Sequence, residues 1–218
     1  MVVGSAAAAQ WRDALKGTPL FTSRNAVLFA YGDALLKFFR PRHFISDYVR
    51  RYAGLPLARK EAADYALLAR IDLHVPRVLG TRTLWNPCGA FESVIALEHL
   101  ADKATALEFL QRAPEPERLG LLRHIADDLQ RMWNAWILHG DLRFGNILVG
   151  GDLVPYWLDP GLKRFRDYAS MRKATDRVIG RFIRLNFHLI GSQGVALLCS
   201  LQLPDSRVQL PGERGSAS

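Results

Sequence analysis

The stretch His139-Gly-Asp-Leu-Arg-Phe-Gly-Asn-Ile-Leu-Val149 indicates how this chain folds, together with Tyr156-Trp-Leu-Asp-Pro-Gly161 shortly after it. Each stretch joins a carboxylate to a short apolar run, with Asp141 in the first and Asp159 in the second. A Gly-Gly-Asp turn separates the two apolar runs, and this pattern predicts a β-hairpin. Both carboxylates are therefore expected at the ends of short strands.

These residue types fit phosphoryl transfer. That chemistry needs one carboxylate to orient or deprotonate the attacking hydroxyl, and a second carboxylate with an amide oxygen to hold magnesium. Asn146 follows Asp141 by five positions, as in the HRDxxxxN loop of kinases, and Asp159 stands where the aspartate of DFG would. By itself, HGD is more often a simple turn with Asn146 as its cap. The spacing and the downstream Asp-Pro-Gly favour the kinase interpretation.

A candidate phosphate-binding lysine lies upstream, in the run Ala34 to Phe39. Lys37 matches the lysine of the VAIK pattern, which points from an apolar strand at nucleotide phosphates. A lone strand lysine is usually solvated, but this one precedes a predicted helix that carries Glu61, a suitable ion-pair partner. An acid early in a helix is also favoured by the helix dipole. Glu92 and Glu98 therefore remain rival partners.

The expected nucleotide contacts come from two further segments. The backbone of Glu98 to Leu100 is expected to hydrogen-bond the adenine. A protein kinase covers the phosphates with GxGxxG, whereas the equivalent stretch here, residues 17–25, holds one glycine. Ser23, Arg24 and Asn25 can still bind phosphate. The shortage of glycine nevertheless leaves a pseudokinase open as an alternative.

The order of predicted elements indicates an α+β, protein-kinase-like fold of two lobes. We expect a small antiparallel β-sheet N-lobe over about residues 11–98, a compact, mostly α-helical C-lobe over about 102–202, and a flexible tail over 203–218. Residues Leu97 to Asp102 are expected to cross between the lobes. Strands are predicted over 19–24, 26–30, 34–39, 74–79, 91–97, 147–149 and 154–158, and helices over 56–71, 107–112, 117–136 and 167–190.

The net charge of +8 indicates an anionic partner. Such a surface attracts nucleotide phosphates, nucleic acid or anionic lipid headgroups. The basic residues gather at Arg40 to Lys60 and at Lys163 to Arg184, although a solvated helix face explains the second cluster equally well. The two cysteines lie far apart without a CxxC, which disfavours a zinc or disulfide framework and fits a reducing cytoplasm. Neither a secretory signal nor a run of ~20 apolar residues is recognisable.

Three stretches of the sequence resemble the lipopolysaccharide core kinases, which are the Kdo and heptose kinases of bacteria. These stretches are HGDLRFGNILV with its following LDP, ALLKFF upstream, and the helix ARKEAADYALLARI ending in VPRVLG. The resemblance runs from about Ala26 to Arg166. HGDxxxxN is shared with aminoglycoside and choline phosphotransferases and, in variant form, with RIO-type atypical kinases. Departures from the family pattern are the glycine-poor loop and the proline after Asp159.

The resemblance implies an enzyme that uses ATP and Mg²⁺ to phosphorylate a sugar hydroxyl of the lipopolysaccharide inner core. It implies that Asp141 is the catalytic base, that Asn146 and Asp159 are metal ligands, and that Lys37 binds phosphate with Glu61 as its partner. The acceptor would be an anionic glycolipid, which implies a cytoplasmic enzyme peripheral to the inner membrane, with no nucleic-acid partner.

Three alternatives remain: a RIO-like atypical protein kinase, a small-molecule phosphotransferase and a pseudokinase binding module. Only 59 residues follow Asp159, too few for the large peptide-binding lobe of ordinary protein kinases. This length disfavours a protein substrate.

Overall fold

The computed structural model describes residues 11, 13–41, 49, 53, 55–84 and 91–204. Two features expected from the sequence lie outside these residues, namely part of the first basic cluster (Arg42, Arg50 and Arg51) and the tail from residue 205 onward. The chain divides into two compact units. Unit 1 comprises Met1–Leu67 and Pro76–Ala101, and unit 2 comprises Leu68–Val75 and Asp102–Ser218.

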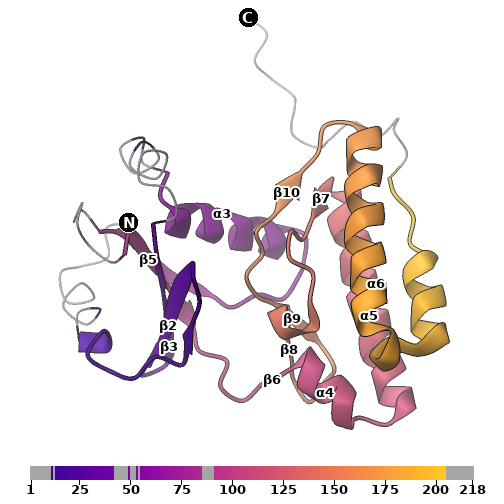
Figure 1. Ribbon diagram of the computed structural model, residues 1–218, viewed down its shortest axis with the longest axis horizontal. Coiled ribbons are helices and arrows are strands. Elements are labelled where there is room, and N and C mark those ends of the chain that lie inside the picture. Colours follow the sequence, from indigo (N-terminus) through magenta and orange to yellow (C-terminus); the bar gives the residue numbers. More distant parts are fainter. Residues whose placement is uncertain are drawn as a thin grey trace, which may run out of the picture. The chain divides into compact units, whose positions relative to one another are not determined.

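Unit 1 is built on a five-stranded antiparallel sheet of order β1-β2-β3-β5-β4 (Figure 1). Gly32, at φ +56°, makes the tight turn between the second and third strands, because only glycine adopts this backbone geometry without strain. The register sets Lys37 on β3 opposite Leu28 on β2 and Ile95 on β5. The strands are β1 (Phe21–Thr22), β2 (Ala26–Tyr31), β3 (Ala34–Phe39), β4 (Val78–Thr83) and β5 (Ser93–Glu98).

One face of the sheet carries the apolar core of unit 1. Alternate residues of β2, β3 and β5 pack there in a core that Trp11 and Ala14 complete from outside the sheet. Phe29 and Phe38 meet edge to face, with ring centroids 5.7 Å apart, an arrangement that aromatic pairs prefer. Lys37, one residue before Phe38, therefore points to the opposite face of the sheet.

Helix α3 (Leu57–Arg70) begins directly after Pro56. Two side chains accept hydrogen bonds from the first N–H groups of the helix. The Leu57 N–H donates to Oε1 of Glu92, the residue before β5, at 2.9 Å, and the Ala58 N–H donates to Oγ of Ser93, the first residue of β5, at 3.3 Å. Ala58, Tyr65 and Leu68 are buried, at the spacing expected of one helix face. The start of α3 is thereby tied to the sheet.

In its described residues from Asp102 to Pro204, unit 2 combines α-helices α4, α5 and α6 with two small antiparallel sheets, of order β6-β8-β9 and β10-β7. The predicted hairpin is present, with Ile147 paired to Trp157 and Val149 to Pro155. The elements are β6 (Ala104–Thr105), α4 (Ala106–Arg112), α5 (Glu115–Asn134), β7 (Ile137–Leu138), the 3₁₀ turn η1 (Phe144–Asn146), β8 (Ile147–Val149), β9 (Pro155–Trp157), β10 (Lys163–Arg164) and α6 (Tyr168–Cys199).

Helices α5 and α6 lie side by side (Figure 1) and bury apolar faces in unit 2. Leu121, Leu122, Ile125, Leu129 and Met132 of α5 are fully buried, and each such side chain stabilises the fold by about 1.5–3 kcal/mol relative to an exposed one. Phe182 of α6 packs against Phe144 at 4.7 Å between ring centroids. The apolar residues whose spacing predicted this helix from the sequence thus form the face of α5 that is buried in this core.

Helix α6 is longer than predicted. The sequence indicated an end near Ile190, whereas the helix continues to Cys199 after a kink at Gly191, where φ is +61° and ψ is −176°. A non-glycine residue would be strained there. By length and composition alone, α6 is the one helix within the described ranges that could cross a membrane, and 28% of its apolar window is buried.

The structure confirms the predicted α+β class, with an antiparallel sheet in unit 1 and mostly helical secondary structure in unit 2.

Candidate active site

Lys37 and Glu61 form a buried ion pair in unit 1. The Lys37 ammonium Nζ lies 3.0 and 2.9 Å from the two Glu61 carboxylate oxygens, and each side chain is only 10% exposed. Strand β3 holds the lysine, and the second turn of α3 holds the glutamate. The predicted pairing is therefore confirmed as a contact, and it fixes an ammonium group on the face of the sheet opposite the apolar core.

The two rival carboxylates have other partners. Glu92 is almost fully buried and accepts the Leu57 N–H at the start of α3. Glu98 accepts the backbone N–H of Arg77 at 3.3 Å. Glu92 therefore anchors the helix that presents Glu61, which explains why a buried acid adjacent to β5 is not the lysine's partner.

The glycine-poor stretch is a hydroxyl-stabilised turn between β1 and β2. Ser23 Oγ accepts the N–H of Asn25 at 3.2 Å and of Ala26 at 3.0 Å, and it lies 3.1 Å from the Ala26 carbonyl. The Ser23 hydroxyl thus shapes the turn, while Arg24 is exposed. A phosphate-binding role in this turn remains a prediction, and it falls more naturally to Arg24.

The segment after β5 has two of its backbone donors engaged. The Glu98 N–H donates to the Arg77 carbonyl at 2.9 Å and the His99 N–H to the Asp33 carbonyl at 2.9 Å. The adenine contact predicted for the backbone of Glu98 to Leu100 stays a prediction.

In unit 2, Asp141, Arg143 and Asn146 come together between β7 and β8. The Arg143 guanidinium donates to Asp141 Oδ2. The Asn146 amide nitrogen donates to the Asp141 carbonyl at 2.8 Å and to its Oδ2 at 3.3 Å. Two donors thus hold the Asp141 carboxylate in one orientation while 42% of its side chain stays exposed. The sequence analysis paired Asp141 with Asn146 but missed Arg143, which the alternation Asp-x-Arg could have suggested.

His139 connects this loop to the segment that carries Asp159. It is fully buried, accepts the Asp141 N–H at Nδ1 at 3.3 Å, and contacts the Leu158 carbonyl through Nε2 at 3.1 Å. Since Nδ1 is the acceptor, the proton resides on Nε2, which donates to Leu158. Burial lowers the pKa of His139, which keeps the ring neutral and this tautomer in place. His139 is a positioning residue that the sequence analysis did not single out.

Gly140 allows a close backbone approach in the same region. A Cβ at this position would lie 2.4 Å from the Gly161 carbonyl oxygen. The glycine of His-Gly-Asp is therefore required by the packing of residues 139–141 against the Asp-Pro-Gly turn. Asp159 and Gly161 in that turn have φ of +49° and +40°, conformations that are strained for aspartate and free for glycine.

The residues of this loop fit a magnesium ion held jointly with phosphate. Because the Asn146 amide nitrogen is the atom that donates to Asp141, the amide oxygen is the atom that could serve as a cation ligand. Asp159 is exposed and directly follows Leu158. The Leu158 N–H donates to the Asn146 carbonyl at 2.8 Å, so the segment that carries Asp159 is hydrogen-bonded to the residue that would supply the amide oxygen. Within the described ranges no group of three or more His, Cys, Asp or Glu side chains could hold a metal alone. Magnesium prefers few protein oxygens together with phosphate and water.

The buried carboxylate of Asp128 forms a hydrogen bond that holds strand β9 in place. The Trp157 indole donates to Asp128 Oδ2 at 2.7 Å, and the Trp157 ring packs against His139 at 5.4 Å between centroids. Burial raises the pKa of Asp128, an effect that the Trp157 hydrogen bond and the nearby Arg131 oppose. The long helix α5 thereby positions the strand that leads to Asp159.

Comparison with known proteins identifies this architecture. No family model matches the sequence, and no curated protein matches it. Among solved structures, WaaP in complex with acyl carrier protein matches with a TM-score of 0.60 and 15% identity, covering 84% of this chain and 76% of WaaP. WbdD matches with a TM-score of 0.55 and 16% identity, covering 84% of this chain and 44% of WbdD. This chain has the lipopolysaccharide-kinase-like fold of these two structures.

Proposed function

We propose that the chain is an ATP- and Mg²⁺-dependent phosphotransferase that phosphorylates a sugar hydroxyl of the lipopolysaccharide inner core, Kdo or heptose. The observation that carries the proposal is the buried Lys37–Glu61 pair. A buried ion pair adds little net stability, because desolvation offsets its Coulomb attraction, and apolar residues of similar volume often serve the fold as well. Such a pair is expected where chemistry needs a fixed ammonium group.

Each residue of the site has a role in this reaction. Asp141 would accept the proton of the attacking sugar hydroxyl, with its carboxylate oriented by Arg143 and Asn146. Lys37 would donate to non-bridging phosphate oxygens, held in place by Glu61. Asn146 and Asp159 would supply oxygen ligands to Mg²⁺. When bound, the ion neutralises charge on the phosphate oxygens and leaving group.

The acceptor class rests on two observations. The fold is that of lipopolysaccharide kinases, and the net charge of +8 suits an anionic glycolipid. We accordingly propose a cytoplasmic enzyme that works at the inner face of the inner membrane. This location would present the lipid-linked acceptor together with cytoplasmic ATP.

The test is transfer of labelled phosphate from ATP to lipid A bearing core sugars, with and without Mg²⁺. Asp141→Asn, Asn146→Ala and Asp159→Ala should each lower turnover by at least about 100-fold, because each removes a proton acceptor or a metal ligand from the transition state. Arg123→Ala, at an exposed cation of α5 outside both basic clusters, is the control and should retain nearly full turnover.

Each other outcome has a clear meaning. ATP binding without turnover in the wild type would identify a pseudokinase. Efficient transfer to a soluble amino-sugar or to a peptide would retain the kinase and remove the lipopolysaccharide acceptor.

A further inference from the structure

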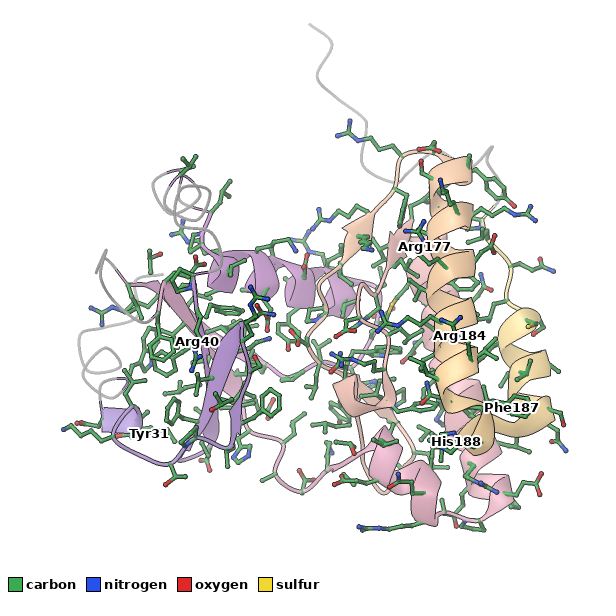
Figure 2. The ribbon with its side chains drawn as sticks, in the orientation of Figure 1. Tyr31, Arg40, Arg177, Arg184, Phe187 and His188 are labelled. Atoms are coloured by element: carbon green, nitrogen blue, oxygen red, sulfur yellow. The ribbon has the colours of Figure 1, made fainter. Side chains whose placement is uncertain are left out.

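The outer face of α6 carries a row of basic residues. Arg177, Arg181, Arg184 and His188 recur at intervals of three or four residues, which places them on one side of the helix, and all four are exposed. Thr175, Ile179 and Phe182, on the opposite side, are buried. Figure 2 shows Arg177, Arg184 and His188 following one another down the helix. At about 1.5 Å per residue, the row from Arg177 to His188 extends for roughly 16 Å.

Large apolar side chains flank this row. Leu185 is 54% exposed and Phe187 is 58% exposed. At about 100° per residue, these two positions fall on either side of the line that Arg177, Arg184 and His188 define. Figure 2 shows Phe187 to one side of that line. The outer face of α6 is therefore basic along its centre and apolar along both margins.

The charge on this face is not neutralised locally. The sequence contains no aspartate or glutamate from Arg177 to Pro204. In the part of the chain that the structure describes, no carboxylate lies within ion-pair distance of Arg177, Arg181 or Arg184. The nearest acid along the helix, Asp176, pairs with Arg172 at 4.0 Å. The row thus keeps its positive potential for an external partner.

We propose that this face of α6, made of Arg177, Arg181, Arg184, Leu185, Phe187 and His188, docks the protein on an anionic lipid bilayer. Guanidinium groups bind lipid phosphates, and leucine and phenylalanine enter the boundary between headgroups and acyl chains. A nucleic-acid backbone attracts the arginines equally but leaves both apolar margins in water. The paired margins therefore favour a membrane.

The helix lies on the membrane and does not span it. Its inner side is occupied by the unit 2 core through Ile179 and Phe182, and the kink at Gly191 interrupts the apolar stretch that would otherwise be long enough to cross. The inference deepens the proposed location of the enzyme. It rests on α6 alone and its test needs no nucleotide, so either proposal can fail while the other stands.

The experiment is flotation of the full chain with vesicles of phosphatidylcholine, with and without added phosphatidylglycerol. Wild type should float only with the anionic vesicles, and binding should weaken as salt rises. Arg177→Gln combined with Arg184→Gln should weaken binding roughly 30-fold, which corresponds to about 1 kcal/mol for each base near an anionic surface. Arg112→Gln combined with Arg123→Gln, two exposed arginines of α4 and α5, is the matched control with the same change in net charge.

The apolar margins are tested separately. Leu185→Ser combined with Phe187→Ser should weaken the part of the binding that persists at high salt, since insertion of apolar groups is not screened. Circular dichroism verifies that each variant is folded.

Three outcomes would overturn the proposal: no flotation of the wild type with anionic vesicles, an equal loss in the control pair, or unchanged binding in both α6 variants. A fourth outcome would also reject the membrane proposal. If Arg177 and Arg184 bind duplex DNA or acyl carrier protein and the protein does not bind vesicles, the face belongs to that partner instead.

Discussion

Replacing Gly140 with alanine should destabilise the protein, because the structure leaves no room for a side chain there. The added Cβ would lie 2.4 Å from the Gly161 carbonyl oxygen, about 1 Å inside ordinary contact at 3.4 Å. The obstacle is backbone, so no side-chain rotation relieves it. Overpacking of this kind costs about 1–3 kcal/mol, which for a chain of this length lowers Tm by roughly 2–12 °C. Thermal unfolding followed by circular dichroism measures the change.

The same substitution should slow the proposed phosphoryl transfer. Relief of the clash moves the loop that holds Asp141 away from the turn that holds Asp159, and a displacement of about 1 Å in a catalytic geometry reduces the rate roughly 100-fold. Gly145→Ala is the matched control, since nothing lies within 4 Å of a Cβ placed there. It should change Tm and turnover little. The reasoning is wrong if Gly140→Ala keeps the wild-type Tm and turnover, or if Gly145→Ala loses as much.

Three further predictions concern buried titratable side chains. Lys37→Met and Glu61→Leu should each lower the free energy of unfolding by about 3–5 kcal/mol, whereas the double variant should lose much less than the sum of these two losses. Urea unfolding measures all of them, and additive losses would contradict the pairing. The control is Lys60→Met at a half-exposed lysine, which should stay within about 1 kcal/mol of the wild type. Because burial raises the pKa of Asp128, the stability that this side chain contributes is present at acid pH and declines as pH rises through the raised pKa. Asp128→Asn should therefore be neutral or stabilising at neutral pH, and a destabilised Asp128→Asn would refute this. Asp128→Ala leaves the buried Trp157 indole donor unpaired and should lower the free energy of unfolding by about 1–3 kcal/mol. Burial lowers the pKa of His139 below its ordinary value of 6.5, so the unfolded chain takes up the proton first and stability should fall as pH drops from 6.5 through the lowered pKa. A plot of Tm against pH across this range should have a slope that His139→Gln reduces. An unchanged slope would exclude His139 as the source of the pH dependence.

Several features of this protein follow from the sequence alone, because they depend on local patterns. The alternation around Lys37 predicts its strand, the three- and four-residue apolar spacing predicts α3 and α5, and Gly-Gly-Asp between apolar runs predicts the hairpin. The five-residue interval between Asp141 and Asn146 predicts their proximity, since a short loop holds them together. These signals extend over a few residues, and the structure reproduces the corresponding elements within a few positions at each end.

Other features were decided by the tertiary structure, because they depend on residues far apart in sequence. The choice of Glu61 over Glu92 required the position of α3, whose first turn uses Glu92 as a cap. Strands β7 and β10 have two residues each and no periodicity to detect, and they exist because Lys163 pairs with Leu138 across an intervening hairpin. The extension of α6 past Gly191 likewise depends on packing, where Gly194 lies against Leu122.

The sequence therefore singled out the residues that are proposed to carry chemistry, and the tertiary structure decided which of them are held rigid and how. His139 shows the physical reason. Nothing in its neighbours indicates that it should be neutral, but burial beside Trp157 removes the water that would solvate a charge, and the hydrogen bonds to Asp141 and Leu158 then fix its tautomer. Desolvation of this kind is produced only when segments distant in the sequence pack together.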